Sequence, residues 1–433
     1  MTHSCEIRAV HARRVWDSRG RPTVEAEVVL HDGSTGRAIV PAGASKGRRE
    51  AVELRDGGER FGGLDVQRAI GHVNGEIADA VRGLAADDQA ALDARLVALD
   101  GTPNKARLGA NATLAVSMAA ARAAAMSHGV PLYQFLGGTG AVLVPMPQIQ
   151  IFGGGAHAGR RVDIQDFMVA CPGAGSFAQA LEWTAEVYRH AGLLMSARGA
   201  ALGVADEGGW WPAFDSNEEA LEALLASIER AGFVPGEQVA IALDVAASDF
   251  GRDGRYTLGL ERRELDSDGL IELLLRWCDR FPIVSIEDPL AEDDAQAFAR
   301  FTRAVGHRLQ VVGDDFLVSD AALVERAAAA GAANAVLLKP NQRGTLTETL
   351  QCWDTARALG YAGIVSARSG ETEDTTIVDL AVGWQVGQLK VGSFARGERM
   401  AKWNEMLRVE ERLGARARFA GAGVFGGKRA AGS

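Results

Sequence analysis

The sequence predicts an α/β protein in which a parallel α/β barrel follows a smaller α+β domain. Short apolar runs indicate the barrel strands, because each ends in a charged residue and each interval to the next holds one strand and one helix. Three of these runs end in the acids Asp244, Glu287 and Asp314. The length agrees, because 433 residues accommodate a barrel of about 250 residues and one smaller domain.

The first predicted domain covers residues 1–140 and combines a hairpin with helices. Alternating apolar and polar residues around the turn Asp32-Gly33 predict half-exposed antiparallel strands between residues 6 and 40. Helical periodicity follows over the ranges 64–84, 87–100 and 110–129. The last range is so rich in alanine that we expect a buried helix with close neighbours.

The second predicted domain is the barrel, over residues 141–425. The boundary lies where glycines between residues 137 and 144 interrupt the helical pattern. The tail, residues 426–433, is small and polar, so we expect it to be loose.

The segment 41–58 is predicted to be a mobile loop of the first domain. Ser45 offers a hydroxyl, and Lys46, Arg48 and Arg49 make the loop positive. Such a loop can fold over an anion and present backbone amides to it. An ordinary surface loop explains the same composition.

Charge and cysteine content narrow the function. The net charge of −10 argues against a nucleic-acid or anionic-membrane partner, so local positive charge must attract any anionic substrate. The four cysteines are too widely spaced for a zinc cluster or a CxxC redox pair, which favours a reduced, cytoplasmic setting. The sequence shows no export signal, no apolar run of membrane-spanning length and no glycine motif for NAD or ATP.

The acids at the strand ends predict a metal site. The carboxyl ends of parallel barrel strands open onto one face, so Asp244, Glu287 and Asp314 converge there. Without a cation they would repel one another, and hard oxygen ligands with no adjacent cysteine or histidine suit Mg²⁺. The alternative is that each acid caps the helix that follows.

The later strands end in basic and polar residues: Lys339, Arg368 with Ser369, and Lys390. A lysine near other cations and a metal loses affinity for its proton and can act as a base. A lysine base and a metal that stabilises an enediolate are what proton abstraction next to a carboxylate requires. Arg368 and Ser369 suit a phosphoryl group. The alternative is that the lysines only neutralise acids in salt bridges.

Long motifs resemble the enolase family along nearly the whole chain. They are DSRGRPTVEAEV and DGTPNKARLGANATLAVSMA in the first domain, and ALDVAASDF, SIEDPLAEDD, VVGDD, LLKPNQRGTLTETL, RSGETEDTTI and GERMAKWNEMLRVEE in the second. The resemblance implies an enolase-type modified TIM barrel with an α+β N-terminal capping domain, arranged as a homodimer or higher homo-oligomer. It also implies Mg²⁺-dependent removal of water from 2-phosphoglycerate.

The resemblance assigns roles to particular residues. The ligands of the first Mg²⁺ are Asp244, Glu287 and Asp314. Lys339 matches the family's base, and Lys390 matches its partner at the substrate carboxylate.

Further roles follow from the same motifs. Glu207 matches the acid that assists loss of the hydroxyl, and Arg368 and Ser369 match the phosphoryl contacts. Ser45 matches the loop serine that closes on a second Mg²⁺, bound with the substrate. Asp166 is predicted to be a further catalytic residue. The remaining predicted pocket residues are His157, Gln165, Lys46 and Ala367.

Several pocket positions depart from the family pattern. Ala367 replaces a histidine, Asp166 replaces a glutamate that is one methylene longer, and Ala42 and Lys46 replace a serine and a threonine in the loop. The usual Asn-Gly-Gly and the residue after it are replaced as well, by Gly153, Gly154, Gly155 and Ala156.

These departures predict a rebuilt pocket. Ala367 and Ala42 would make room near the phosphoryl site, and Lys46 would add positive charge. We therefore expect a 2-phosphonoformylglycerate-like substrate and a carboxyphosphonoenolpyruvate product, as in the enolase-like synthases of phosphinate antibiotic pathways. The alternatives are ordinary conversion of 2-phosphoglycerate to phosphoenolpyruvate, and a binding protein without catalytic activity.

Overall fold

The computed structural model describes residues 5–44, 47–200 and 203–425. The predicted loop residues Ser45 and Lys46 and the predicted tail 426–433 lie outside the described residues.

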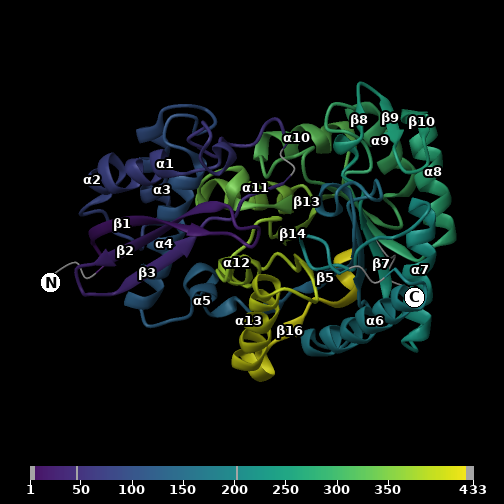
Figure 1. Ribbon diagram of the computed structural model, residues 1–433. Coiled ribbons are helices and arrows are strands. Elements are labelled where there is room, and N and C mark those ends of the chain that lie inside the picture. The colour runs from purple at the N-terminus through teal and green to yellow at the C-terminus, as the bar shows by residue number, and fades with distance from the viewer. Residues whose placement is uncertain (1–4, 45–46, 201–202, 426–433) are drawn as a thin grey trace.

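The N-terminal domain is built on a three-stranded antiparallel sheet (Figure 1). Its strands are β1 (Ile7–Trp16), β2 (Pro22–Leu30) and β3 (Thr35–Ile39), in that spatial order. The predicted hairpin is β2 and β3. The alanine-rich range forms α4 (Ala110–Ser127), which is buried along most of its length, as predicted.

The first predicted helix is interrupted. Residues 64–84 form α1 (Gln67–His72), the π-helical turn η2 (Val73–Ile77) and α2 (Ala78–Val81). Gly75 leaves helical geometry, with φ −107° and ψ −107°. Next to it, the Asn74 side chain bonds both backbone groups of Ala12 on β1, at 2.6 and 3.0 Å. This docking onto the sheet accounts for the break. The other helices of the domain are α3 (Gln89–Asp100) and α5 (Leu132–Gly137).

The barrel is closed by eight strands in the order β11, β12, β13, β14, β15, β5, β6, β7. Their bounds are β5 (Met146–Gly153), β6 (Asp166–Ala170), β7 (Ala240–Asp244), β11 (Ile283–Glu287), β12 (Gln310–Gly313), β13 (Ala335–Leu338), β14 (Ala362–Ser366) and β15 (Gln388–Ser393). The fold class is therefore the predicted one, a modified α/β barrel with an α+β cap.

One strand departs from the parallel arrangement. β6 runs antiparallel to both β5 and β7, while the other neighbouring pairs are parallel. The connection from β5 to β6 contains only the short turn η4 (Gly155–Ala158), and a parallel crossover needs a helix or a longer segment. As a result β6 begins, rather than ends, at the face where the other strands end.

Helices surround the barrel (Figure 1). They are α6 (Phe177–Ala197), α7 (Asn217–Arg230), α8 (Ser267–Arg280), α9 (Ala295–Val305), α10 (Ala321–Ala330), α11 (Leu346–Ala358), α12 (Thr376–Gly383) and α13 (Gly397–Leu413). Two small sheets complete the chain, formed by β8 (Gly251–Arg252), β9 (Arg255–Leu258) and β10 (Arg263–Asp266), and by β4 (Leu143–Val144) and β16 (Arg418–Phe419). Within the described residues, no helix combines the length and apolar character needed to cross a membrane.

The N-terminal domain contacts the carboxyl ends of the barrel strands. Ala42 pairs with Gly370 in a backbone bridge, and Ala51 N donates to Gln342 O at 2.8 Å. These bonds bring the described part of the segment 41–58 over the strand ends. We propose the domain boundary at residue 140, between α5 and the first barrel strand.

The contact between β3 and α4 generates a stability prediction. A Cβ on Gly36 would lie 2.0 Å from Ala119 O and 2.2 Å from Ala123 N, so the strand and helix backbones leave no space for a side chain. Gly36→Ala should lower the free energy of unfolding by about 3 kcal/mol through overpacking. Thermal unfolding midpoints would measure this. The control is Gly71→Ala, where a Cβ meets nothing within 4 Å. Equal midpoints for the two variants would contradict the packing argument.

Asp379 on α12 generates a pH prediction. Burial raises the pKa of Asp379 to about 7, although it accepts a hydrogen bond from Tyr133 N at 3.1 Å. This value exceeds the unfolded pKa of about 3.9, so the folded state holds the proton more tightly and stability falls as the pH rises through this interval. Asp379→Asn cannot ionise. Relative to wild type, its free energy of unfolding should increase between pH 4 and 7, by up to a few kcal/mol. Above pH 7 the difference between the two proteins should stay constant. If the free energies of unfolding of the two proteins differed by a constant amount from pH 4 to 7, the prediction would be wrong.

Candidate active site

Three buried acids lie at the barrel face where most strands end. Asp244 ends β7 and Glu287 ends β11, and the two are partners in the parallel register. Asp314 directly follows β12, the next strand. Each acid is at most 6% exposed.

These acids do not serve as the caps of the helices that follow. In the described chain, α9 after β11 is capped by Asp294, and α10 after β12 is capped by Asp320. Asp288, beside Glu287, instead ties the strand ends together. Its side chain accepts the backbone N–H groups of Asp314 and Asp315 at 2.9 and 2.8 Å.

Lys390, on β15, lies among carboxylates from three strands. Its Nζ is 2.7 Å from Asp244 Oδ2, 2.9 Å from Glu287 Oε2 and 3.4 Å from Asp166 Oδ2. Gln165 Nε2 also donates to Asp244 Oδ2, at 2.9 Å. Asp166 reaches this cluster because β6 is antiparallel, which places its first residue in register with Asp244.

Lys339 forms a second cluster beside the first. It directly follows β13, and its Nζ donates to Asp314 Oδ2. Gln342 Nε2 donates to the other oxygen of the same carboxylate at 2.9 Å. The acids and lysines thus form a network of alternating charge.

The charge of the acids is incompletely balanced. Burial raises the pKa of Glu287 well above its usual value, and repulsion from Asp244 adds to this effect. Among the described residues, Glu287 Oε1 and Gln165 Oε1 have no hydrogen-bond donor. Free, buried oxygen ligands next to repelling carboxylates are suited to a hard cation such as Mg²⁺. The three carboxylates are not drawn together in this structure, since the close groups of potential ligands in its described part do not include them as a set.

The expected loss of proton affinity at the lysines is not found. Burial is the largest effect on the pKa of Lys339 and lowers it, but the nearby carboxylates, chiefly Asp314 and then Glu287, oppose it, and the net direction is upward. The pKa of Lys390 lies well above its usual value, because Asp244 and Glu287 outweigh its burial. Both lysines therefore form ion pairs in this structure, as the salt-bridge alternative describes.

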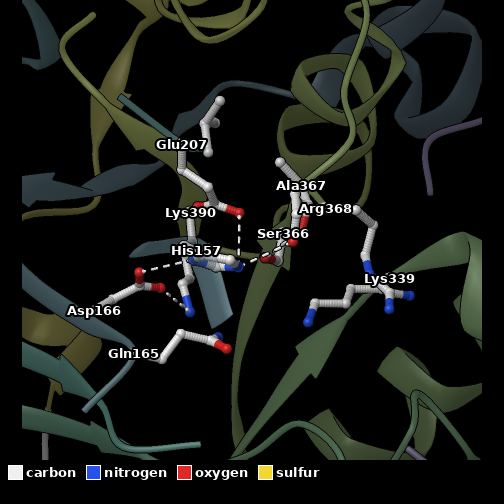
Figure 2. Close-up of a pocket in the computed structure, with 11 residues that line it drawn as sticks. His157, Gln165, Asp166, Glu207, Lys339, Ser366, Ala367, Arg368 and Lys390 are labelled. Atoms are coloured by element: carbon white, nitrogen blue, oxygen red, sulfur yellow. Dashed lines mark hydrogen bonds and ion pairs between the residues drawn. The ribbon is translucent and has the colours of Figure 1, made fainter. Parts of the chain in front are cut away.

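A further group of side chains surrounds His157, next to Lys390 and Asp166 (Figure 2). His157 Nε2 is 2.9 Å from Ser369 Oγ and 3.8 Å from Glu207 Oε1, and its Nδ1 is 3.5 Å from Asp166 Oδ1. Burial lowers the pKa of His157, but the nearby carboxylates, chiefly Glu207 and Asp166, raise it, and the net direction is upward. The protonated imidazolium is therefore favoured. Asp166, although shorter than a glutamate, contacts both His157 and Lys390.

The glycines before His157 have a packing role. A Cβ on Gly154 would lie 2.2 Å from Ile164 O, and Gly155 has φ +48°, which disfavours other residues. The loop between β5 and β6 therefore folds back on itself and brings His157 into the site.

Arg368 and Ser369 follow β14 and face the same cavity. Arg368 Nη1 is 3.1 Å from both Glu50 Oε2 and Asn341 Oδ1. The backbone of this segment is bound from behind by α13. Arg399 Nη1 donates to Arg368 O at 2.7 Å, and Lys402 Nζ donates to Thr372 O.

The cavity between these groups has a volume of about 20 Å³. It is lined by His157, Gln165, Asp166, Glu207, Lys339, Ser366, Ala367, Arg368, Ser369, Lys390 and Val391 (Figure 2). The predicted pocket residues that the structure describes thus meet at one point, whereas Ser45 and Lys46 lie outside the described residues.

Several supporting residues were not predicted. Glu50 and Asn341 hold Arg368, Gln342 holds Asp314, and Gln150 donates to Asp166. A signal was present for two of them, because Asn341 and Gln342 lie within three residues of Lys339. For Glu50 no sequence signal links it to a residue more than 300 positions away.

Comparison with known proteins identifies the family. The family model described as "Enolase, N-terminal domain" matches residues 7–136, and that described as "Enolase, C-terminal TIM barrel domain" matches residues 141–427. A curated relative named Enolase, from Rubrobacter xylanophilus, is 51% identical over 421 residues, which covers 97% of this chain and 98% of the relative.

The prediction of a carboxyphosphonoenolpyruvate synthase is wrong. The close, nearly full-length similarity to a protein named Enolase supports the ordinary enolase alternative instead. The extra space that was expected beside Ala42 is also missing. Ala42 is buried, and its carbonyl accepts a hydrogen bond from Arg19 Nη2 at 2.8 Å, so Arg19 fills the space beside it.

The family models and the relative agree over nearly the full length of the sequence. The chain belongs to the enolase family, whose members are Mg²⁺-dependent carbon–oxygen lyases of the hydro-lyase type.

Proposed function

We propose that this protein removes water from 2-phosphoglycerate to give phosphoenolpyruvate. The observation that carries the proposal is the meeting of Lys339, Glu207 and Arg368 at one cavity in a chain of this family. These side chains offer a base, an acid and an anion contact on different sides of one space.

Lys339 is proposed to take the proton from the carbon next to the substrate carboxylate. Lys339 lines the cavity, and Asp314 accepts a hydrogen bond from its Nζ there. The electron pair of the broken bond passes toward the substrate carboxylate, where Lys390 supplies positive charge. This arrangement requires Lys339 to be neutral when it acts.

Glu207 is proposed to donate a proton to the hydroxyl that leaves from the neighbouring carbon. It is buried, and it lies 3.8 Å from His157, whose positive charge would stabilise the carboxylate that remains. The products balance, because one proton goes to Lys339 and the other leaves with the hydroxyl as water.

Arg368, Ser369 and His157 are proposed to hold the phosphoryl group. The guanidinium can bind two phosphoryl oxygens at once, and the Ser369 hydroxyl already contacts His157. Arg368 is held by Glu50 in this structure, so an incoming phosphoryl group would compete with that carboxylate.

Asp244, Glu287 and Asp314 are proposed to hold the first Mg²⁺. When bound, the ion would offset repulsion among these acids and stabilise negative charge on the substrate carboxylate. Gln165 orients Asp244, and Gln342 orients Asp314, so the ligand oxygens have fixed directions. A role of Ser45 at a second ion stays a prediction.

A homodimer and a cytoplasmic location are proposed on the family resemblance alone. Light scattering coupled to gel filtration would give the mass of the oligomer. The alternative of an inactive binding protein has no specific observation in its favour, since the chain carries residues for the proposed base, acid and metal ligands.

The separate roles of Lys339 and Glu207 generate the central prediction. Lys339→Ala should slow both dehydration and exchange of the carbon-bound hydrogen with solvent by about 100- to 10,000-fold, because it removes the proposed base. Glu207→Gln should slow dehydration similarly and leave exchange in place, because it affects only the hydroxyl. Phosphoenolpyruvate absorbance and NMR of 2-phosphoglycerate in heavy water would measure the two rates.

A matched control removes another buried lysine. Lys105→Ala breaks a buried ion pair with Glu348 outside the cavity, and its folded fraction should retain exchange. If Lys339→Ala kept normal exchange, Lys339 would not be the base. If the wild-type protein showed neither exchange nor dehydration in Mg²⁺, the inactive alternative would hold.

Metal binding at the strand ends gives a further prediction. Glu287→Gln should raise the Mg²⁺ concentration needed for half-maximal activity at least tenfold, on the order of the losses seen for metal-site substitutions. In chelator, its unfolding midpoint should equal or exceed that of wild type, because a repelling buried acid has been removed. If the variant were destabilised in chelator and its Mg²⁺ dependence were unchanged, Glu287 would be a structural partner of Lys390 and not a metal ligand.

A further inference from the structure

A group of potential metal ligands lies in the N-terminal domain, outside the active site. Cys5 precedes β1, Asp87 precedes α3, and His128 follows α4. Their ligand atoms all lie within 4.8 Å of one another. Within the described residues, the other such group is His157, Asp166 and Glu207, which belongs to the active site.

We propose that Cys5, Asp87 and His128 form a binding site for Zn²⁺. His128 Nε2 is 3.7 Å from Cys5 Sγ and 3.2 Å from Asp87 Oδ2. With usual Zn–S, Zn–N and Zn–O bonds at tetrahedral angles, ligand atoms are separated by roughly 3.4–3.6 Å. The pairs centred on His128 therefore already have spacings close to those of a zinc site.

The chemistry of the ligands selects the metal. A thiolate, an imidazole and a carboxylate together favour Zn²⁺ or Co²⁺ over hard ions such as Mg²⁺. Binding converts the Cys5 thiol to its thiolate and releases the proton to solvent. Three protein ligands leave the fourth position to water.

Backbone bonds hold the ligands in place before any ion binds. Ala86 N donates to Cys5 O at 2.9 Å, which fixes Cys5 beside the residue preceding Asp87. His128 N donates to Ala124 O at 2.9 Å as the C-cap of α4. The Phe135 ring lies 5.7 Å from the His128 ring, which restricts its rotation.

The surroundings favour a cation and allow it to enter. His128 lies at the carboxyl end of an 18-residue helix, where the helix dipole attracts positive charge. The side chains of His128 and Asp87 are 47% and 36% exposed. Next to Cys5, the Ser127 hydroxyl lies 3.2 Å from Sγ and donates to Asp32, so a second carboxylate is close.

The proposed role is structural. The site joins the start of β1, the segment before α3 and the end of α4, which are far apart in the sequence. An ion that binds only the folded state raises stability. Zn²⁺ should therefore raise the unfolding midpoint of the N-terminal domain without taking part in catalysis.

Cobalt spectroscopy provides the test. The full-length protein, stripped of transition metals and kept in excess Mg²⁺, would be titrated with Co²⁺. Thiolate-to-cobalt charge transfer would be followed in the near ultraviolet. The signal would report Cys5, because Cys171, Cys278 and Cys352 are buried. Competition with Zn²⁺ then gives the Zn²⁺ affinity.

The variants are Cys5→Ser and His128→Gln, with His72→Gln as the control. His72 also pairs with a carboxylate, with Nδ1 3.1 Å from Glu76 Oε1, but within the described chain no thiol completes a site there. Cys5→Ser should lose the charge-transfer band, and His128→Gln should bind at least about tenfold more weakly. His72→Gln should behave as wild type, and all three should keep enolase-type turnover.

Two results would overturn the proposal. One is a wild-type protein that gives no charge-transfer band at millimolar Co²⁺. The other is a band and a Zn²⁺-dependent rise in unfolding midpoint that persist in Cys5→Ser.

Discussion

The site depends on the repulsion among acids that the barrel holds at one end. Asp244 and Glu287 lie side by side because their strands are in parallel register, and neither can move away without breaking the barrel. Lys390 reduces the repulsion but leaves one Glu287 oxygen without a donor. A bound cation or substrate can relieve the repulsion that the folded protein leaves in place. The free energy released in this way is available for catalysis.

The N-terminal domain completes the site from the other side. Glu50 reaches across to Arg368, and the backbone bridge between Ala42 and Gly370 fixes the distance between the two domains. Residues of both domains therefore contribute to the candidate site.

Much of the fold could be predicted from periodicity and spacing. The acids and lysines were identified because they end apolar runs, and that pattern is local in the sequence. The antiparallel direction of β6 was not predicted, because a five-residue strand carries no signal of its direction. The space around Ala42 was misjudged, because a small side chain creates room only if no neighbour fills it, and Arg19 lies beside Ala42. In the same way, the wide spacing of cysteines excluded a cysteine cluster but could not indicate that Cys5 meets a histidine more than 120 residues away.

The support that α13 gives to the anion-binding segment has a consequence for biosynthesis. Arg399 and Lys402 bind backbone carbonyls of residues 368–372 from behind, and both are fully buried. The ribosome makes these cations about 30 residues after the segment that they position. A nascent chain can complete most of its strands before then, but its anion-binding segment stays unsupported until α13 has left the exit tunnel and docked. Enzymatic competence is therefore acquired at the end of synthesis, and premature termination before α13 would release a chain with a nearly complete barrel and no working site.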